Sequence, residues 1–190
     1  EGKALEPDSD TYDTDGMSES EVSAARVVKH AVATESRDAS LLTIKVAGES
    51  GGERRPLTAV QERQLGAYIS EIKDAGVRVA LVNMEADTFG CMVDVYYNAM
   101  LEPESVQSSC EAAIRDYIEN LPFNGEYTNM ALVDRLQVVE GVKIVELLGS
   151  TARAADENTT TRINARLTPK AGYFKPGVIT VNMKAYDGQG

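Results

Sequence analysis

Few residues in this chain have the types and spacing that catalysis or metal binding requires. His30 is the only histidine, so any mechanism in which an imidazole activates a Ser or Cys nucleophile would have to use it. It follows Lys29 in a segment that we expect to be an exposed helix. Because a zinc site takes about four ligands, mostly Cys and His, we expect no metal site and no catalytic residue.

Carboxylates are plentiful, but their spacing is typical of a solvated surface. Four aspartates between residues 8 and 15 resemble the start of a calcium loop, yet Gly16 follows the last of them and no Glu stands at the required distance. We therefore interpret residues 1–16 as a flexible acidic linker. The Gly-rich run at residues 48–52 lacks the Lys-Ser/Thr ending of a phosphate-binding loop, so we expect no cofactor.

The net charge limits the partners that we expect. At a formal charge of −11 the chain is repelled by nucleic acid and by anionic membranes, and it has no apolar run of the roughly 18 residues that a membrane span needs. We therefore expect neither nucleic acid nor membrane as a partner. The chain begins with Glu1 and not with Met, so we interpret it as a fragment or a processed product.

The two cysteines favour packing over chemistry. Cys91 falls in an expected strand and Cys110 on the apolar face of an expected helix. Both are interpreted as small buried hydrophobic residues, and a disulfide between them is possible but not required.

In the first half of the chain, the pattern predicts the order α-β-α-β. A capping box opened by Ser18 begins a helix that should run to about Ala33. Residues 41–47 read as a strand, a second capping box at Thr58 opens the next helix, and a strand follows over residues 77–82. The crossover is long enough to make the two strands parallel neighbours.

In the second half, the pattern predicts β-α-α-β followed by further strands. Residues 92–97 alternate as a half-exposed strand, and a helix with a continuous apolar stripe runs from Pro103 to Pro122. Thr128 or Asn129 caps the next helix. Further strands are expected over residues 142–148, 163–167 and 178–183, with an exposed loop over residues 150–160.

These elements predict an α+β fold made of two small α/β subdomains, with helices packed on mixed sheets. After the linker at residues 1–16, we expect a middle α/β domain over residues 17–84 and a C-terminal α/β domain over residues 85–190.

Four aromatic residues are candidates for a protein interface, because exposed aromatic rings are frequent binding hot spots: Tyr96, Phe123, Tyr173 and Phe174. Tyr173 and Phe174 lie in a connection bounded by Gly and Pro, which anchors either a loop onto its own domain or a partner. Alternation along the strand predicts that Asp94 faces solvent or a partner.

Two short motifs carry a family resemblance. Residues 121–126 read Leu-Pro-Phe-Asn-Gly-Glu at the end of one helix, and residues 138–142 read Val-Val-Glu-Gly-Val where the second helix leads into a strand. This arrangement resembles the C-terminal part of the baseplate J-like proteins of contractile phage tails and related injection machines. Residues 18–82 are similar to the middle domain of that family, so the resemblance covers most of the chain.

The resemblance implies a structural protein that acts through assembly. Members of the family form baseplate wedges, dimerise or pair with other baseplate proteins, and carry no catalytic residues. It implies a place in the virion baseplate or a tail-like particle, and in the bacterial cytoplasm during assembly. Two alternatives stay open at this point: a small-ligand-binding regulatory module of α+β type, and an enzyme with an unrecognised site.

Overall fold

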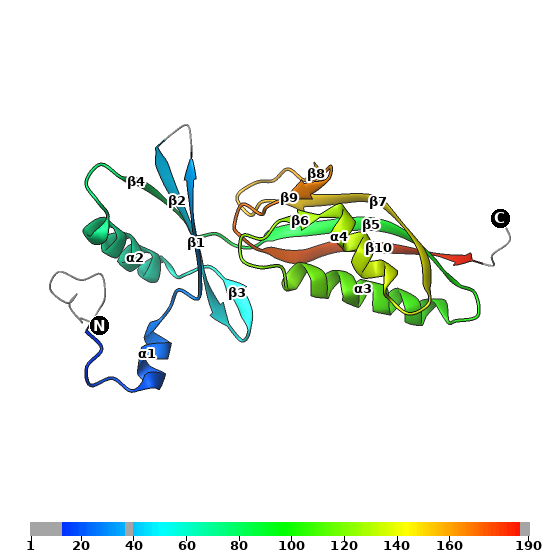
Figure 1. Ribbon diagram of the computed structural model, residues 1–190, viewed down its shortest axis with the longest axis horizontal. Coiled ribbons are helices and arrows are strands. Elements are labelled where there is room, and N and C mark those ends of the chain that lie inside the picture. The colour runs from blue at the N-terminus through cyan, green and yellow to red at the C-terminus, as the bar shows by residue number, and fades with distance from the viewer. Residues whose placement is uncertain (1–12, 37–39, 187–190) are drawn as a thin grey trace. The chain divides into compact units, whose positions relative to one another are not determined.

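The computed structural model describes residues 13–36 and 40–186, and the chain divides into two compact units at residues 1–83 and 84–190 (Figure 1). Each unit combines helices with a sheet of mixed strand direction, which confirms the α+β fold. Most of the expected acidic linker at residues 1–16 lies outside the described residues.

The first unit is built around strand β2. In chain order its elements are α1 (Glu19–Ala25), β1 (His30–Ser36), β2 (Leu41–Ser50), β3 (Glu53–Arg55), α2 (Ala59–Ile72) and β4 (Arg78–Val82). Strand β2 pairs antiparallel with β1 and β3 and parallel with β4, so the expected parallel crossover is confirmed. Both expected capping boxes form, one at the start of each helix.

The first helix is shorter than the sequence pattern predicts. It ends at Ala25, and His30 lies on strand β1, so the expectation of a helix to about Ala33 was wrong. A seven-residue helix with no buried side chain is marginal, whereas β1 gains a full backbone ladder with β2. The β-branched residue Val32 also packs better on a pleated strand than in a helix.

The first unit has a small buried core that is supplemented by a polar clip. Its buried hydrophobic residues are Val46, Ala47 and Leu57. The backbone N–H of Leu57 donates to Asn83 Oδ1 at 2.7 Å, and Asn83 Nδ2 donates to the Leu57 carbonyl at 3.0 Å and to Glu62 at 2.9 Å. This clip ties the segment after β4 to the start of α2.

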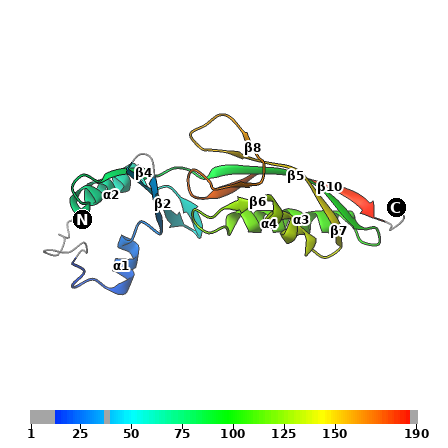
Figure 2. The same cartoon turned by 45° about the horizontal axis from the view of Figure 1, so that its top comes forward.

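The second unit contains a four-stranded sheet. In chain order its elements are β5 (Asp87–Asn98), α3 (Pro103–Glu119), β6 (Tyr127–Thr128), α4 (Asn129–Gln137), β7 (Val142–Arg153), β8 (Thr161–Ile163), β9 (Arg166–Leu167) and β10 (Phe174–Tyr186). The sheet order is β10-β5-β7-β8, and β10 runs parallel to β5 while the other pairs are antiparallel. Helices α3 and α4 lie together on one side of this sheet (Figure 2).

The core of the second unit lies between that side of the sheet and the two helices. Its fully buried members from strand β5 and from the helices are Phe89, Val93, Val95, Cys110, Ile114, Ile118, Leu132 and Leu136. Cys91 and Cys110 are both buried and both free, which confirms their interpretation as core residues. The apolar stripe of α3 therefore packs into the core, as its helical spacing predicts.

Strand β7 is longer than expected. It continues through Ser150 and Ala152 to Arg153, so the exposed loop begins after that point and not at residue 150. Ser150 and Ala152 are buried because they pair with β5 on one side and with β8 on the other. The expected loop was wrong for these residues, since their small side chains do not reveal a central strand.

A strand glycine provides a test of the β10–β5 packing. A Cβ atom added at Gly177 would lie 2.8 Å from the Phe89 carbonyl oxygen and 2.5 Å from a methyl group of Thr88, whereas one added at Gly149 would meet no atom within 4 Å. We expect Gly177→Ala to lower the free energy of unfolding by about 1–3 kcal/mol, and Gly149→Ala to change it by less than about 1 kcal/mol. Urea unfolding followed by far-UV circular dichroism measures both; equal losses would contradict the close approach.

Candidate protein-interaction surface

The sheet of the second unit has a second face, opposite α3 and α4, which we call the outer face. Side chains alternate along each strand, so the residues of the outer face are the neighbours of those in the core. They are Met92, Asp94 and Tyr96 on β5, Ile144, Glu146 and Leu148 on β7, and Thr180, Asn182 and Lys184 on β10.

The outer face exposes large apolar side chains. Met92 and Ile144 are each 46% exposed, and Leu148 is 40% exposed beside a bulge in the ladder. Tyr96 is half-buried, and the strand register places it between Ile144 and Lys184. Apolar side chains gathered on one open sheet face are a feature of surfaces that bind other proteins.

One polar cluster lies among these apolar residues. Asp94 is 6% exposed; its carboxylate accepts a hydrogen bond from Asn182 Nδ2 at 2.8 Å and forms an ion pair with Lys184. The Lys184 ammonium lies 5.2 Å from the centre of the Tyr96 ring, within the range of a cation–π interaction. Asp94 thus lies on the face away from the helices, as alternation predicts, and of the two expected environments, solvent or a partner, the structure shows it covered by Asn182 and Lys184 of the same chain.

The cluster shifts the pKa values of both charged groups in the directions that an ion pair requires. The hydrogen bond from Lys184, followed by that from Asn182, lowers the pKa of the Asp94 carboxyl below its ordinary value of 3.8. The hydrogen bond to Asp94 raises the pKa of Lys184 above its ordinary value of 10.5. Both groups therefore stay charged across the physiological range, and neither is prepared to transfer a proton near pH 7.

The structure separates the four aromatic interface candidates. Tyr96 lies on the outer face, and Phe123 is half-buried in the turn after α3, with its ring 6.2 Å from that of Tyr173. Tyr173 and Phe174 are only 3% and 5% exposed. These two residues are corrected from interface candidates to core residues, because Tyr173 donates a hydrogen bond to the Met84 carbonyl at 3.0 Å and Phe174 packs on Phe89.

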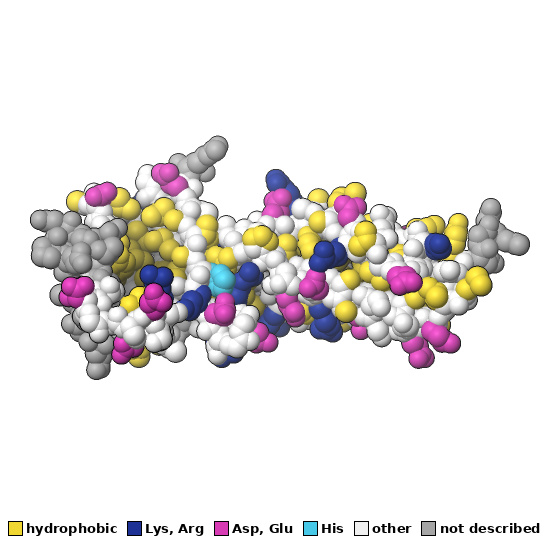
Figure 3. All heavy atoms as spheres, turned by 60° about the horizontal axis from the view of Figure 1, so that its bottom comes forward, with side chains coloured by type: hydrophobic (Ala, Val, Ile, Leu, Met, Phe, Trp, Pro, Cys, Tyr) yellow, Lys and Arg dark blue, Asp and Glu magenta, His cyan; other side chains and the backbone are white. Residues whose placement is uncertain are grey.

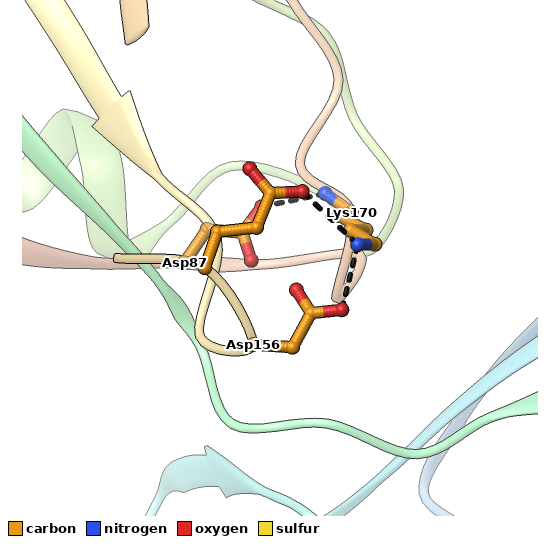
Figure 4. A network of polar contacts seen from close by, with 4 residues as sticks. Asp87, Asp156 and Lys170 are labelled. Atoms are coloured by element: carbon orange, nitrogen blue, oxygen red, sulfur yellow. Dashed lines mark hydrogen bonds and ion pairs between the residues drawn. The ribbon is translucent and has the colours of Figure 1, made fainter. Parts of the chain in front are cut away.

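A second polar cluster joins a loop to the start of β5. Lys170 lies between Asp87 and Asp156 (Figure 4). Its backbone N–H donates to Asp87 at 2.6 Å, and its Nζ atom donates to Asp156 at 2.7 Å and to Glu157 at 3.2 Å. The hydrogen bonds from Nζ to Asp156 and then Glu157 raise the pKa of Lys170. Because its ammonium is held by two carboxylates, this lysine clasps the loop and is not a nucleophile.

A buried serine belongs to a third polar cluster, and it too is structural. Ser150 is fully buried, and its Oγ atom donates to Asn129 Oδ1 at 2.6 Å. Tyr127 donates to the same oxygen at 3.1 Å, and burial raises the pKa of its hydroxyl. An amide oxygen cannot accept the proton of a serine nucleophile as a general base would, so this cluster fixes the start of α4.

Within residues 13–36 and 40–186, no group of three or more His, Cys, Asp or Glu side chains is arranged to hold a metal ion. His30 lies on β1 with Nε2 3.5 Å from the Glu49 carboxylate, far along the chain from both cysteines. None of the helices in the described part of the chain is long and apolar enough to cross a membrane. Figure 3 shows acidic and basic side chains interspersed with apolar ones on the face that it presents.

No family model matches this chain, and no curated protein matches it by sequence. The interpretation of the outer face therefore depends on its own geometry. Sequence reasoning identified Tyr96 but missed Lys184, which lies 90 residues from Asp94 and meets it only through the pairing of β10 with β5.

The Asp94 ion pair predicts a measurable change in acid titration. In Lys184→Met we expect the Asp94 pKa to rise toward its ordinary value, because the main stabilising partner of the carboxylate is lost. A carboxyl whose pKa is lowered by folding stabilises the fold at any pH above its unfolded-state pKa. That stabilisation is lost as the pH falls through the folded-state pKa. The variant should therefore be less stable than the parent chain at pH 7 and no less stable at strongly acidic pH.

Carboxyl-detected NMR titration and unfolding at several pH values test this expectation. Lys175→Met removes an exposed lysine of the same strand and serves as the control. An unchanged Asp94 pKa in Lys184→Met would show that the ion pair does not persist in solution.

The cysteines should be inert while the protein is folded. Burial raises the pKa of Cys91 to about 12 and that of Cys110 to about 11, so the reactive thiolate is scarce at neutral pH. We expect alkylation by iodoacetamide to be slower than in the urea-unfolded chain on the order of a hundredfold or more. Met92→Cys, which places a thiol on the outer face, should react rapidly. Fast labelling of the folded parent chain would contradict the buried placement.

Proposed function

We propose that this chain is a structural component of a phage-tail-like baseplate, a wedge subunit that acts through protein–protein assembly. The observation that carries the proposal is the resemblance of residues 121–126 and 138–142 to the motifs of baseplate J-like proteins. The exposed apolar residues of the outer face support it independently, because they provide a surface for assembly.

The two motifs have a clear physical role in the fold. Residues 122–125 form a tight turn in which the Gly125 N–H donates to the Pro122 carbonyl at 2.7 Å, and Asn124 adopts a positive φ of 59°. Gly141 also has a positive φ, of 87°, which a side chain would strain. The motifs thus reverse the chain after α3 and again after α4, and they define a scaffold.

The proposal implies particular partners and locations. The chain would bind other baseplate proteins and copies of itself, in a tail-like particle and, before that, in the bacterial cytoplasm. The outer face supplies the contact, since its one buried acid is already neutralised by Lys184 and its apolar residues are accessible. Such an assembly role requires no cofactor.

Mass spectrometry of purified tail-like particles tests the proposal directly. We expect this chain at a fixed ratio to the tube and sheath proteins of particles from induced source cells. Its absence from particles that contain other baseplate proteins would overturn the proposal and favour a ligand-binding module, which metabolite-dependent thermal stabilisation would then reveal.

Two variants localise the contact within the same experiment. Ile144→Lys places a charge on the outer face and should reduce recovery of the chain in particles by about tenfold, because an uncompensated charge would be buried. Val138→Lys places the same charge at a position that is 79% exposed and outside the outer face, and should leave recovery unchanged. Equal recovery of both variants would exclude the outer face as the contact.

A further inference from the structure

Strand β10 forms one edge of the sheet in the second unit. Among the described residues it pairs only with β5, so the backbone groups along its other side have no strand partner in the sheet. After the irregularity between Pro176 and Ile179, the ladder is regular from residue 179 to residue 186. A regular edge of this length is a template for adding another strand.

The residue that would normally protect such an edge is held elsewhere. Edge strands are commonly guarded by a charged residue, most often lysine, or by proline. Lys184 is the only charged residue between positions 179 and 186, and no proline occurs there. Its ammonium is held on the outer face by the Asp94 carboxylate and lies over the Tyr96 ring. The regular part of the edge is therefore left without a guard.

We propose that the β10 edge pairs with the same strand of a second copy of this chain, so that two four-stranded sheets join into one across a twofold axis. The inference goes beyond the proposed tail role and does not depend on it. It follows from the sequence of the strand, because two copies paired antiparallel place apolar residues opposite apolar residues and do not have to place like charges together.

When two identical strands pair antiparallel around one central residue, positions equally far from that residue lie opposite each other. Side chains on the helix side of one copy therefore lie opposite side chains on the helix side of the other, and the same holds for the outer face. In the register centred on Asn182, Val181 lies opposite Met183 of the second copy on the helix side, and Thr180 lies opposite Lys184 of the second copy on the outer face. Because the segment has one charge, two lysines oppose each other only in the register centred on residue 184.

Charge permits a self-contact along this strand. The chain carries −11 overall, but β10 from Phe174 to Tyr186 contains no acidic residue. Two copies can therefore approach along β10 without opposing carboxylates from the strand itself. The remaining repulsion between the two acidic chains is long-range and screened by salt, so the association should strengthen as ionic strength rises.

Sedimentation equilibrium of the full chain tests the proposal. We expect the mass to rise from 20.5 kDa to twice that value with a dissociation constant of about micromolar order, and the constant to fall as salt is added. Thr180→Lys places a second positive charge on the edge, where it faces Lys184 of the other copy or lies diagonal to it, and should weaken the dimer by about tenfold. Thr161→Lys makes the same change on β8, the opposite edge of the sheet, and should leave the constant unchanged.

Hydrogen exchange of the parent chain locates the contact without any variant. We expect amides within residues 179–186 to become protected as the protein concentration passes the dissociation constant. A mass of 20.5 kDa at all concentrations up to about 100 µM overturns the proposal, as does a dimer in which Thr180→Lys and Thr161→Lys behave alike. Protection of β10 only inside tail-like particles also overturns it, in favour of a strand from another protein. Presence in particles tests the tail role separately.

Discussion

The parallel pairing of β10 with β5 is the interaction on which the second unit depends. It joins residues 174–186 to residues 87–98, so the two ends of the unit meet in neighbouring strands of the sheet. Helix α3 packs against β10 as well as α4 and β5, and therefore its apolar stripe is fully covered only once this long-range pair has formed. Closing such a loop costs conformational entropy before the contacts repay it, so we expect the pair to form late in folding. The clasp of Lys170 on Asp87 and the hydrogen bond from Tyr173 to Met84 hold the chain in register where the pair begins.

The same pairing gives the sheet its two different faces. On one face, Val93, Val95 and Val181 face α3 and α4 and supply the hydrophobic stabilisation of the unit. On the other, Asp94 and Lys184 meet although they are 90 residues apart. The lysine of this ion pair is 45% exposed, so solvent screens the pair and it adds little stability. The helix-covered face therefore supplies most of the stability of the unit. The outer face is thus free to serve another purpose without weakening the core. The first unit has a smaller buried core around Val46 and Ala47, and its Asn83 clip compensates with directional hydrogen bonds.

Features decided by residues close together in the sequence could be predicted, whereas features that depend on pairing between distant strands could not. The capping boxes at Ser18 and Thr58, the stripe of α3 and the Thr128 cap all form as expected, because each is decided by residues a few positions apart. The end of α1 was missed because β1 gains its stability from β2, not from its own propensity. Tyr173 and Phe174 illustrate the same limit, since a Gly/Pro-bounded aromatic pair looks like a surface loop until β5 is placed beside it. Of the candidate surface, Tyr96 and Asp94 could be placed by alternation along β5, whereas their partners Asn182 and Lys184 come from β10.

The internal pairing of Asp94 is a physical argument for the proposed protein contact on the outer face. When a partner covers an unpaired carboxylate, the carboxylate loses its water contacts, and this desolvation costs a large amount of binding free energy. Asp94 avoids this cost because Lys184 and Asn182 already satisfy it within the chain. Covering the cluster then removes no isolated ion from water, while Met92, Ile144 and Leu148 contribute apolar area that gains from burial. The outer face also carries Glu146, which is exposed and lies opposite Asp94 in the strand register, so one of its two acids stays in solvent while the buried one is paired within the chain. The buried acid is thus compensated internally and the apolar residues are accessible, a combination that suits association.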